Sequence, residues 1–253
     1  MNRYRFTSRL AIAGAALLGV AGLAVAGCGS GAASTSTAGT ASSAASTAAS
    51  TAAPAGGSSF TGTTLFPIAV GNTWTYKIVT AGVAAGTTAD KIIKVTPVSG
   101  GNQVTTAHSF NGVTTTETLL FGSDGSITQP LTSIGSTTVR VKSGSIVWPS
   151  QAVIDSGQPV KSTIVIVASV AGQSHSITAH VTVKGAGSAT VTVPAGTYHT
   201  TIVKSTISES IAGFTVSIAI QDWLAPGVGP VKTQVATDGR VISGEELTSF
   251  VKG

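Results

Sequence analysis

Four histidines and nine carboxylates are the side chains of this chain that are most often recruited for catalysis or metal binding. The histidines are His108, His175, His180 and His199, and none has the spacing to another ligand that metal sites require. His175 and His180 are five residues apart on one predicted strand, so their side chains point to opposite faces. The sequence also contains no phosphate-binding loop and no calcium loop. We therefore expect neither a metal ion nor a cofactor.

Serine and threonine are too abundant for a nucleophile to be recognised from residue type alone. A hydrolase nucleophile would often lie in a Gly-x-Ser-x-Gly turn between a strand and a helix, and the chain has no such motif. The nearest approach, GQSHSIT from Gly172, is better explained as a hairpin that enters a strand. The sequence thus predicts no catalytic residue and no enzyme.

One pair of titratable residues is brought together by a turn. Asn111-Gly112 separates two alternating segments and supplies the two positive φ angles of a two-residue hairpin turn. Such a turn fixes the register, so His108 and Glu117 become diagonal neighbours on one face. If that face lines a cavity, the two groups shift each other's pKa and can bind or protonate a ligand. At a sheet margin they would be a hydrogen-bonded polar pair. The same face carries the apolar Val104, Phe110, Val113 and Leu119.

The single cysteine, Cys28, follows a segment with the composition of an export signal. Three arginines within the first nine residues give a positive start, residues 10–25 are apolar and uncharged, and Ala26-Gly27 are small. A membrane-spanning helix needs about 20 apolar residues, and this segment is shorter. We expect residues 1–27 to be a cleaved signal peptide.

The end of this signal, Val25-Ala26-Gly27-Cys28, resembles the bacterial lipobox, which directs lipid attachment to the cysteine and cleavage just before it. The resemblance implies that the mature protein begins at Cys28 and is held by its lipid on the extracytoplasmic side of the bacterial cell membrane. Two or three acyl chains are enough for stable anchoring. The alternative is an ordinary secretory signal that happens to contain a cysteine. Because there is no second cysteine, the exported domain must fold without disulfides.

Residues 28–59 connect this cysteine to the rest of the chain and are almost entirely Ala, Ser, Thr and Gly. A segment with nothing large to bury cannot offset the entropy of ordering. We therefore expect a flexible tether with a mean reach of about 30 Å. Its serines and threonines permit O-glycosylation, although no acceptor motif identifies a site.

The charges give no sign of a nucleic-acid partner. Without the three arginines of the signal, eleven Lys and Arg stand against nine Asp and Glu. These charges are spread singly along the chain and form no basic stripe.

From Phe60 to Gly253 the chain consists of alternating Val, Ile and Thr segments separated by turn residues, which predicts one all-β domain. About a dozen strands in one chain favour a strongly curved antiparallel sheet or open barrel, that is, a half-barrel. A two-sheet sandwich is the alternative. Besides the hairpin strands, we expect strands at 74–79, 91–95, 137–142, 160–170, 175–184, 190–193, 198–211 and 214–223.

Two further dipeptides, Asp124-Gly125 and Asp238-Gly239, predict two-residue hairpin turns of the same kind. In the last hairpin, this register places Lys232 opposite Glu245 as a cross-strand ion pair.

Three segments together resemble a family of bacterial envelope proteins, the 3108-like domain-of-unknown-function family: LFPIAVGNTWTYKI from Leu65, VTVPAGTYHTTIVK from Val191 and DWLAPGVGPVK from Asp222. The resemblance spans the β domain. The family is distantly related to curved-sheet lipoprotein carriers whose concave face holds acyl chains. It therefore implies a curved sheet, and it supports a fold more directly than an activity. The motifs also have a folding role, because Pro194, Gly196 and Pro226-Gly227 suit tight turns.

The function expected from these observations is binding without catalysis, with a lipid or another apolar ligand held on the concave face. A ligand pocket would need an apolar volume of at least about 300 Å³. The alternatives are a structural or adhesive envelope module without a ligand and, with less support, a hydrolase. The sequence does not indicate an oligomeric state. The candidate ligand-facing residues are Trp74, Tyr76, His108, Glu117, Trp148 and Trp223. The alternative interpretation of Trp74, Tyr76 and Trp223 is that they anchor the core.

Overall fold

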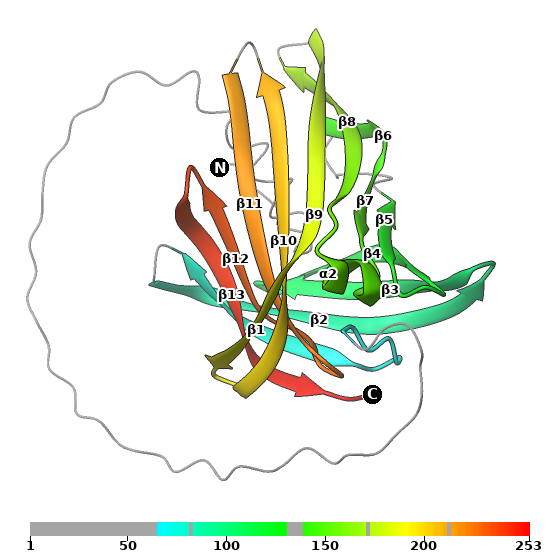
Figure 1. Cartoon of the computed structure of the whole chain (residues 1–253), viewed down its shortest axis with the longest axis vertical. Helices are drawn as coiled ribbons and strands as arrows, with labels where there is room; N and C mark the ends of the chain where they lie inside the picture. The colour runs from blue at the N-terminus through cyan, green and yellow to red at the C-terminus, as the bar shows by residue number, and fades with distance from the viewer. Residues whose placement is uncertain (1–64, 81–82, 131–138, 171–172, 212–213) are drawn as a thin grey trace, which may run out of the picture.

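The computed structural model describes residues 65–80, 83–130, 139–170, 173–211 and 214–253. The predicted signal peptide (1–27), Cys28, the tether (28–59) and the first residues of the domain lie outside these ranges. Within them the chain is almost entirely β (Figure 1). The strands are β1 (Thr73–Thr80), β2 (Val83–Val98), β3 (Gly101–Phe110), β4 (Val113–Gly122), β5 (Ile127–Pro130), β6 (Val139–Ser143), β7 (Ser145–Trp148), β8 (Val160–Val170), β9 (Gln173–Val193), β10 (Gly196–Ile211), β11 (Phe214–Ala225), β12 (Gly229–Thr237) and β13 (Arg240–Val251).

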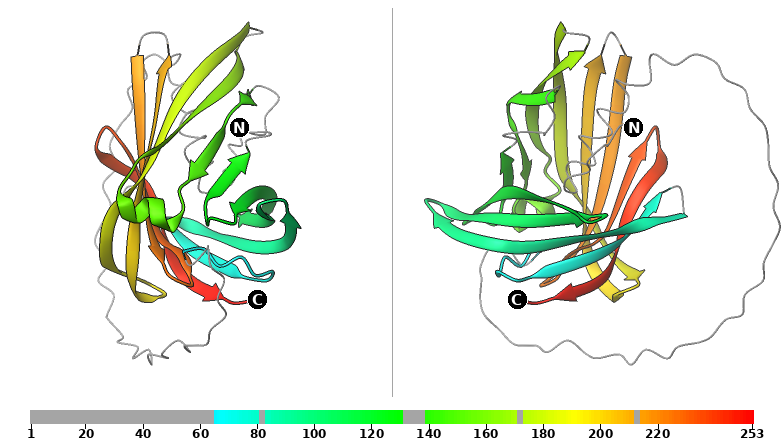
Figure 2. Two further views of the ribbon diagram at one scale, coloured as in Figure 1. Left: turned by 45° about the vertical axis from the view of Figure 1, so that its right-hand side comes forward. Right: turned by 180° about the vertical axis from the view of Figure 1, so that it is seen from behind.

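All thirteen described strands belong to one antiparallel sheet in the order β6-β8-β9-β10-β11-β12-β13-β1-β2-β3-β4-β5-β7. The sheet is strongly twisted, so that β1 to β4 cross the direction of β8 to β11 (Figure 2). It curls into a nearly closed barrel, because its two edge strands, β6 and β7, are consecutive in the chain. The expected open barrel is confirmed, and the single continuous sheet excludes the two-sheet sandwich.

Gly144, between β6 and β7, is the point at which the chain changes partners. Ser143 pairs with β8, whereas Ser145 pairs with Pro130 of β5. Gly144 has a φ of +102°, and a Cβ there would lie 2.2 Å from the carbonyl oxygen of Thr163. Only glycine fits this backbone. β6 and β7 thus act as one strand split between the two sheet margins, and no ladder joins β7 to the adjacent β8. We call the gap between β7 and β8 the seam.

Two apolar clusters fill the barrel, and the alternation of residues along each strand explains them. The first cluster contains Ile146, Ile154, Ile164, Ile166, Ala179, Val181, Val183, Val203, Ile207, Ile218, Ile220 and Val235. The second cluster contains Ile68, Trp74, Tyr76, Ile92, Val104, Leu119, Phe121, Val193, Ala225, Val231 and Leu247.

Polar side chains also face the interior of the barrel. On β12, for example, Thr233 lies between Val231 of the second cluster and Val235 of the first. The other buried polar residues of this kind include Thr88, His108, Gln129, Asp222 and Glu245, and the partly buried Asp90 and Glu117 contact two of them.

The helix of the described residues, α2 (Gln151–Ser156), has six residues and follows β7. It packs on β9, where Gly185 allows the carbonyl of Ile154 to approach closely. Within the described ranges we find no candidate transmembrane helix.

The hairpin turns show where sequence reasoning fixes the register. Asn111-Gly112 and Asp238-Gly239 both have positive φ angles, as a two-residue turn requires. The prediction for Asp124 is wrong, since the Gly122 N–H donates to the carbonyl oxygen of Ser126 and the Gly125 N–H donates to that of Gly122, which closes a three-residue loop. The Asp124 carboxylate accepts hydrogen bonds from the backbone N–H and the hydroxyl of Ser126, which stabilises the longer loop.

The predicted pairing of Lys232 with Glu245 is also wrong. A β-bulge between Val235 and Ala236 shifts the register by one residue, so Lys232 lies opposite Glu246. A bulge leaves an extra residue on one strand and changes which side chains face each other beyond it. Glu245 therefore turns to the interior opposite Thr233, and Glu246 stays on the outer face.

Candidate functional site

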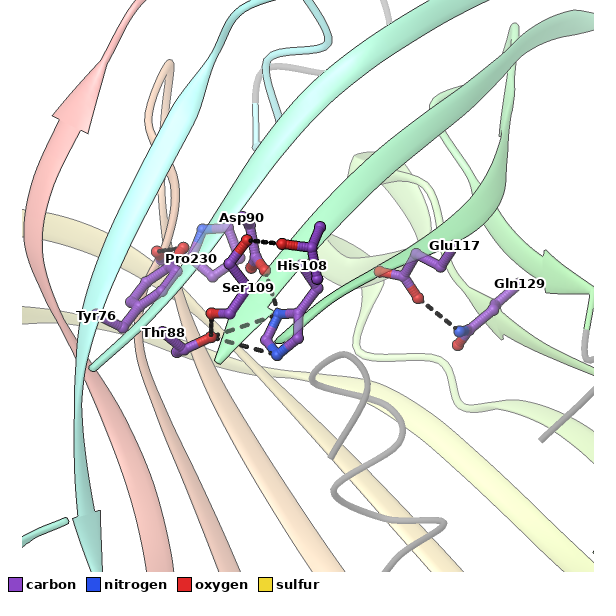
Figure 3. A network of polar contacts seen from close by, with 9 residues as sticks. Tyr76, Thr88, Asp90, His108, Ser109, Glu117, Gln129 and Pro230 are labelled. Carbon is purple, nitrogen blue, oxygen red and sulfur yellow. Dashed lines mark hydrogen bonds and ion pairs between the residues drawn. The ribbon is translucent and has the colours of Figure 1, made fainter. Parts of the chain in front are cut away.

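The first hairpin places His108 in the barrel as its turn predicts. His108 lies opposite Thr115, and Glu117 lies opposite Thr106. His108 is 7% exposed, and its Nδ1 is 2.6 Å from Oδ1 of Asp90 on the neighbouring strand β2 (Figure 3). The principal partner of the imidazole is thus Asp90, and the diagonal Glu117 acts on it only through its charge.

Two opposing effects set the pKa of His108. Burial lowers the pKa of the imidazole, because the charged form loses hydration. The hydrogen bond and charge of Asp90 raise it, as do the charges of Glu245 and Glu117. The net result is a pKa above the ordinary value of 6.5. The imidazole therefore gains a proton more readily than in water.

Thr88 lies beside this pair and gives it a superficial likeness to a hydrolytic triad. The Thr88 hydroxyl oxygen is 3.3 Å from Nε2 and 3.4 Å from Nδ1 of His108. Nearly equal distances place the oxygen beside the carbon between the two nitrogens, out of line with the acceptor lone pair of either. The hydroxyl donates to the carbonyl oxygen of Ser109, and Thr88 is only 3% exposed. This geometry does not activate a nucleophile.

Glu117 is held on the other side of the hairpin. The amide Nε2 of Gln129 on β5 donates to Glu117 at 2.9 Å (Figure 3). Gln129 is buried and Glu117 is partly buried, so their contact lies within the barrel. The predicted pair of His108 and Glu117 is thus two separate polar contacts on one interior face.

Trp74 and Tyr76 lie in the filled second cluster, each only 1% exposed. The indole of Trp74 donates to the carbonyl oxygen of Val228 at 2.5 Å, and its ring lies 5.2 Å from that of Phe250. The Tyr76 hydroxyl donates to the carbonyl oxygen of Pro230 at 3.1 Å. Both bonds tie β1 to the start of β12, so these aromatic residues anchor the fold.

Trp223 lies on the opposite face of β11 from Asp222, since it pairs with Lys232 across the ladder. Lys232 Nζ is 5.7 Å from the centre of the Trp223 ring and 3.2 Å from Oε1 of Glu246. Lys77 Nζ is 3.1 Å from Oε2 of the same carboxylate. Burial raises the pKa of Glu246, but its hydrogen bonds and the charges of the two lysines lower it by more. Trp223 is thus half-buried: it packs against the second cluster and also contacts Lys232, and it is not among the residues that line the interior recess described below.

Trp148 is the candidate residue that lines a recess in the interior. Five apolar side chains and two polar ones surround this recess: Ile146, Trp148, Val181, Ile207, Ile220, Ser205 and Asp222. Its volume is about 10 Å³, which is room for about one water molecule and far below the 300 Å³ expected of a ligand pocket. We call it the apolar recess. One of its walls is β7, at the seam.

A family model matches residues 71–247, which include the Trp74 strand, the Pro194 turn and the Pro226-Gly227 turn. The chain belongs to the DUF3108-like family. In this DUF3108-like domain the turns adopt the expected geometry. Val193 pairs with Gly196, so Pro194 is the second residue of its turn and Gly196 the fourth, and Gly227 has a φ of +72°. No curated protein matches the chain.

Solved structures with the same fold come from two bacteria. A Bacteroides fragilis protein named "putative exported protein with YmcC-like fold" has a TM-score of 0.53 and 19% identity, and the match covers 74% of this chain and 98% of that one. A Parabacteroides distasonis "putative lipoprotein" has a TM-score of 0.55 and 16% identity, covering 75% and 99%. At these identities the likeness establishes the fold.

Besides Asp90 and the inward-facing Glu245, sequence reasoning missed two more interior carboxylates of this DUF3108-like domain, Asp222 and Glu209. Asp222 is 5% exposed and accepts a hydrogen bond from the Thr233 hydroxyl at 2.7 Å. Glu209 is 3% exposed, and among the described residues neither of its oxygens has a hydrogen-bond partner. Burial raises the pKa of Glu209 to about 7. A signal existed for both, since each alternates with buried apolar residues of its strand.

Metal binding finds no support in the described part of the chain, where no three His, Cys, Asp or Glu side chains lie close enough to hold an ion. His180 and His199 are exposed and have threonine hydroxyls as their neighbours.

Proposed function

We propose that this protein is an extracytoplasmic lipoprotein, anchored to the bacterial cell membrane through Cys28, whose barrel binds a lipid or another apolar ligand without catalysis. The lipobox-like end of the signal supports the anchor. An exported protein and a lipoprotein among the structural neighbours share the fold. The family and these neighbours carry no enzymatic designation. Residues 28–59 would then be the tether that separates the domain from the membrane.

The single observation that carries the ligand proposal is the position of the seam beside the apolar recess. β7 is joined to the sheet by four residue pairs with β5 and by no ladder to β8. Its inward side chains, Ile146 and Trp148, cover apolar residues of the first cluster. An acyl chain can take their place if β7 moves outward, because both coverings are apolar.

The small volume of the recess sets a condition on this proposal. A chain of twelve carbons cannot fit in about 10 Å³, so binding requires β7 to separate from β8 along the seam. β7 has only four residues, and its ladder with β5 is one of the shortest of the sheet, so few backbone hydrogen bonds oppose its movement.

A structural or adhesive envelope module is the second candidate. The filled second cluster around Trp74 and Tyr76 favours it, since this half of the barrel holds itself closed with its own side chains. A module of this kind would bind no acyl chain at the seam.

The anchor is tested by metabolic labelling with radioactive palmitate. The full chain should incorporate label, and Cys28→Ala should abolish incorporation. Ser30→Ala, two residues along, is the matched control and should remain labelled. Label that persists in Cys28→Ala would contradict the anchor.

The ligand site is tested by titrating the full chain with a fluorescent long-chain alcohol, whose neutral head group tests the apolar contacts alone. Trp148→Ala should raise the Kd by about tenfold or more, because it removes the largest apolar contact of the recess. Val241→Ala, at an exposed position, should leave the Kd unchanged. No saturable binding to the unmodified chain would favour the structural module.

A further inference from the structure

Glu209 is a buried carboxyl group that the fold itself does not use. Its position on β10 continues the interior series of Val203, Ser205 and Ile207, so its side chain points into the barrel. It lies one interior position, about 7 Å, beyond Ile207, which lines the apolar recess. Both carboxyl oxygens lack a hydrogen-bond partner among the described residues.

Among the described residues, the neighbours of Glu209 on the adjacent strands supply no opposite charge. Across the two ladders it faces Ala179 of β9 and Val216 of β11. The lysines of β9 and β10, Lys184 and Lys204, are exposed on the outer face. A buried carboxyl without a donor or a cation is costly, and burial accordingly raises its pKa to about 7. A partner from outside the chain would remove this cost.

Glu209 and the apolar recess together have the features of a site for an amphiphile. The recess offers apolar contacts from Ile207, Ile220 and Trp148, and Glu209 lies beyond one end of it, toward the β10–β11 turn. At the other end, Asp222 already accepts a hydrogen bond from Thr233. At the Glu209 end of the recess, a ligand could therefore supply the hydrogen-bond donor that the carboxyl group lacks among the described residues.

We propose that the barrel interior binds an amphiphile with a protonated amine head group, whose ammonium donates to Glu209 while its alkyl chain lies in the apolar recess beside Trp148. This inference rests on the proposed function, because it uses the same recess and the same opening at the seam. It adds the charge of the ligand's head group. An anionic head group is disfavoured at this position, since it would face a carboxylate with no cation beside it.

Three probes with the same chain of twelve carbons separate the head group from the chain. Dodecylammonium, dodecanol and dodecanoate are titrated into the full chain at pH 8 by calorimetry, below their micelle-forming concentrations. We expect dodecylammonium to bind at least about tenfold more tightly than dodecanoate, with dodecanol between them, since a charge-assisted hydrogen bond contributes about that factor.

Glu209→Gln is the test variant, and Asp238→Asn is the matched control. Asp238 is exposed and lies in a turn at a φ of +51°, which asparagine also adopts, so this change removes one solvent-exposed carboxylate that does not line the recess. Glu209→Gln should abolish the preference for dodecylammonium and retain the binding of dodecanol. Asp238→Asn should retain both.

Two results would overturn the inference while leaving the proposed function intact. One is dodecanoate binding to the unmodified chain as tightly as dodecylammonium, and the other is an unchanged preference in Glu209→Gln. If none of the three probes binds, the proposed function fails and this inference fails with it.

Discussion

Replacing Glu209 with glutamine removes a buried ionisable group and should change how the stability of the fold depends on pH. In the folded chain burial raises the pKa of Glu209 from 4.5 to about 7. The folded state therefore holds this proton more tightly than the unfolded state does. As the pH rises from the unfolded pKa to the folded one, the unfolded chain ionises first, and the free energy of unfolding falls.

The size of the effect follows from the shift. Each unit of pKa corresponds to about 1.4 kcal/mol, so between pH 5 and pH 8 Glu209 lowers the free energy of unfolding by about 2 to 3 kcal/mol. Above pH 8 this contribution is constant. Glu209→Gln lacks this pH-dependent contribution, because glutamine does not ionise. At pH 5 the Glu209 side chain of the native protein is largely neutral, so that pH serves as the reference for each protein.

Urea unfolding of the full chain and of Glu209→Gln, each at pH 5 and pH 8, measures the effect. Other titrating groups, His108 among them, contribute equally to both proteins and cancel in the comparison. We expect the change in unfolding free energy between the two pH values to differ by about 2 to 3 kcal/mol between the proteins. Equal pH dependence, within about 0.5 kcal/mol, would refute the assignment of Glu209 as a buried carboxyl without a partner.

Three further changes test other parts of the structure. Asp90→Asn should lower the pKa of His108 in an NMR titration, and an unchanged pKa would be inconsistent with the contact. In the native protein, the stability that this pair contributes is present below pH 6.5 and is lost as the pH rises through the raised pKa of His108. Gly144→Ala should lower the unfolding free energy by about 2 to 4 kcal/mol, because its Cβ meets backbone at a positive φ, while Ser143→Ala stays within about 0.5; equal effects would argue against the split strand. Glu246→Gln should lower the free energy of unfolding by about 0.5 to 1 kcal/mol at pH 7 and by less in high salt; a loss that is independent of salt would contradict the two lysine contacts. The stability that Glu246 contributes should be lost as the pH falls through its lowered pKa.

The sequence predicted those parts of the fold that depend on local geometry. Asn111-Gly112 determines its own turn, and the turn determines the register of β3 and β4, which is why the interior position of His108 could be derived. The same reasoning failed at Lys232, because a β-bulge depends on packing across the sheet and leaves no mark in the turn.

The candidate site was only partly predictable for a similar reason. Asp90 and His108 meet because β2 and β3 pair in a register that includes a bulge between Ile92 and Lys94, and no short motif encodes that register. Glu209 could have been found, since it has the same alternation as Ile207. Aromatic residue type alone could not separate a ligand contact from a core anchor: Trp74 lies in the filled second cluster, and Trp223 packs against that cluster and contacts Lys232.

Photo-crosslinking in cells tests most directly whether the barrel holds a lipid. Bacteria that make the full chain are fed a fatty acid bearing a diazirine, irradiated, and the crosslinked peptides of the protein are identified by mass spectrometry. The account predicts crosslinks to β7 (Ser145–Trp148) and to the interior-facing residues of β10 and β11, reduced in Trp148→Ala. Crosslinks confined to other parts of the chain would contradict a lipid at the seam.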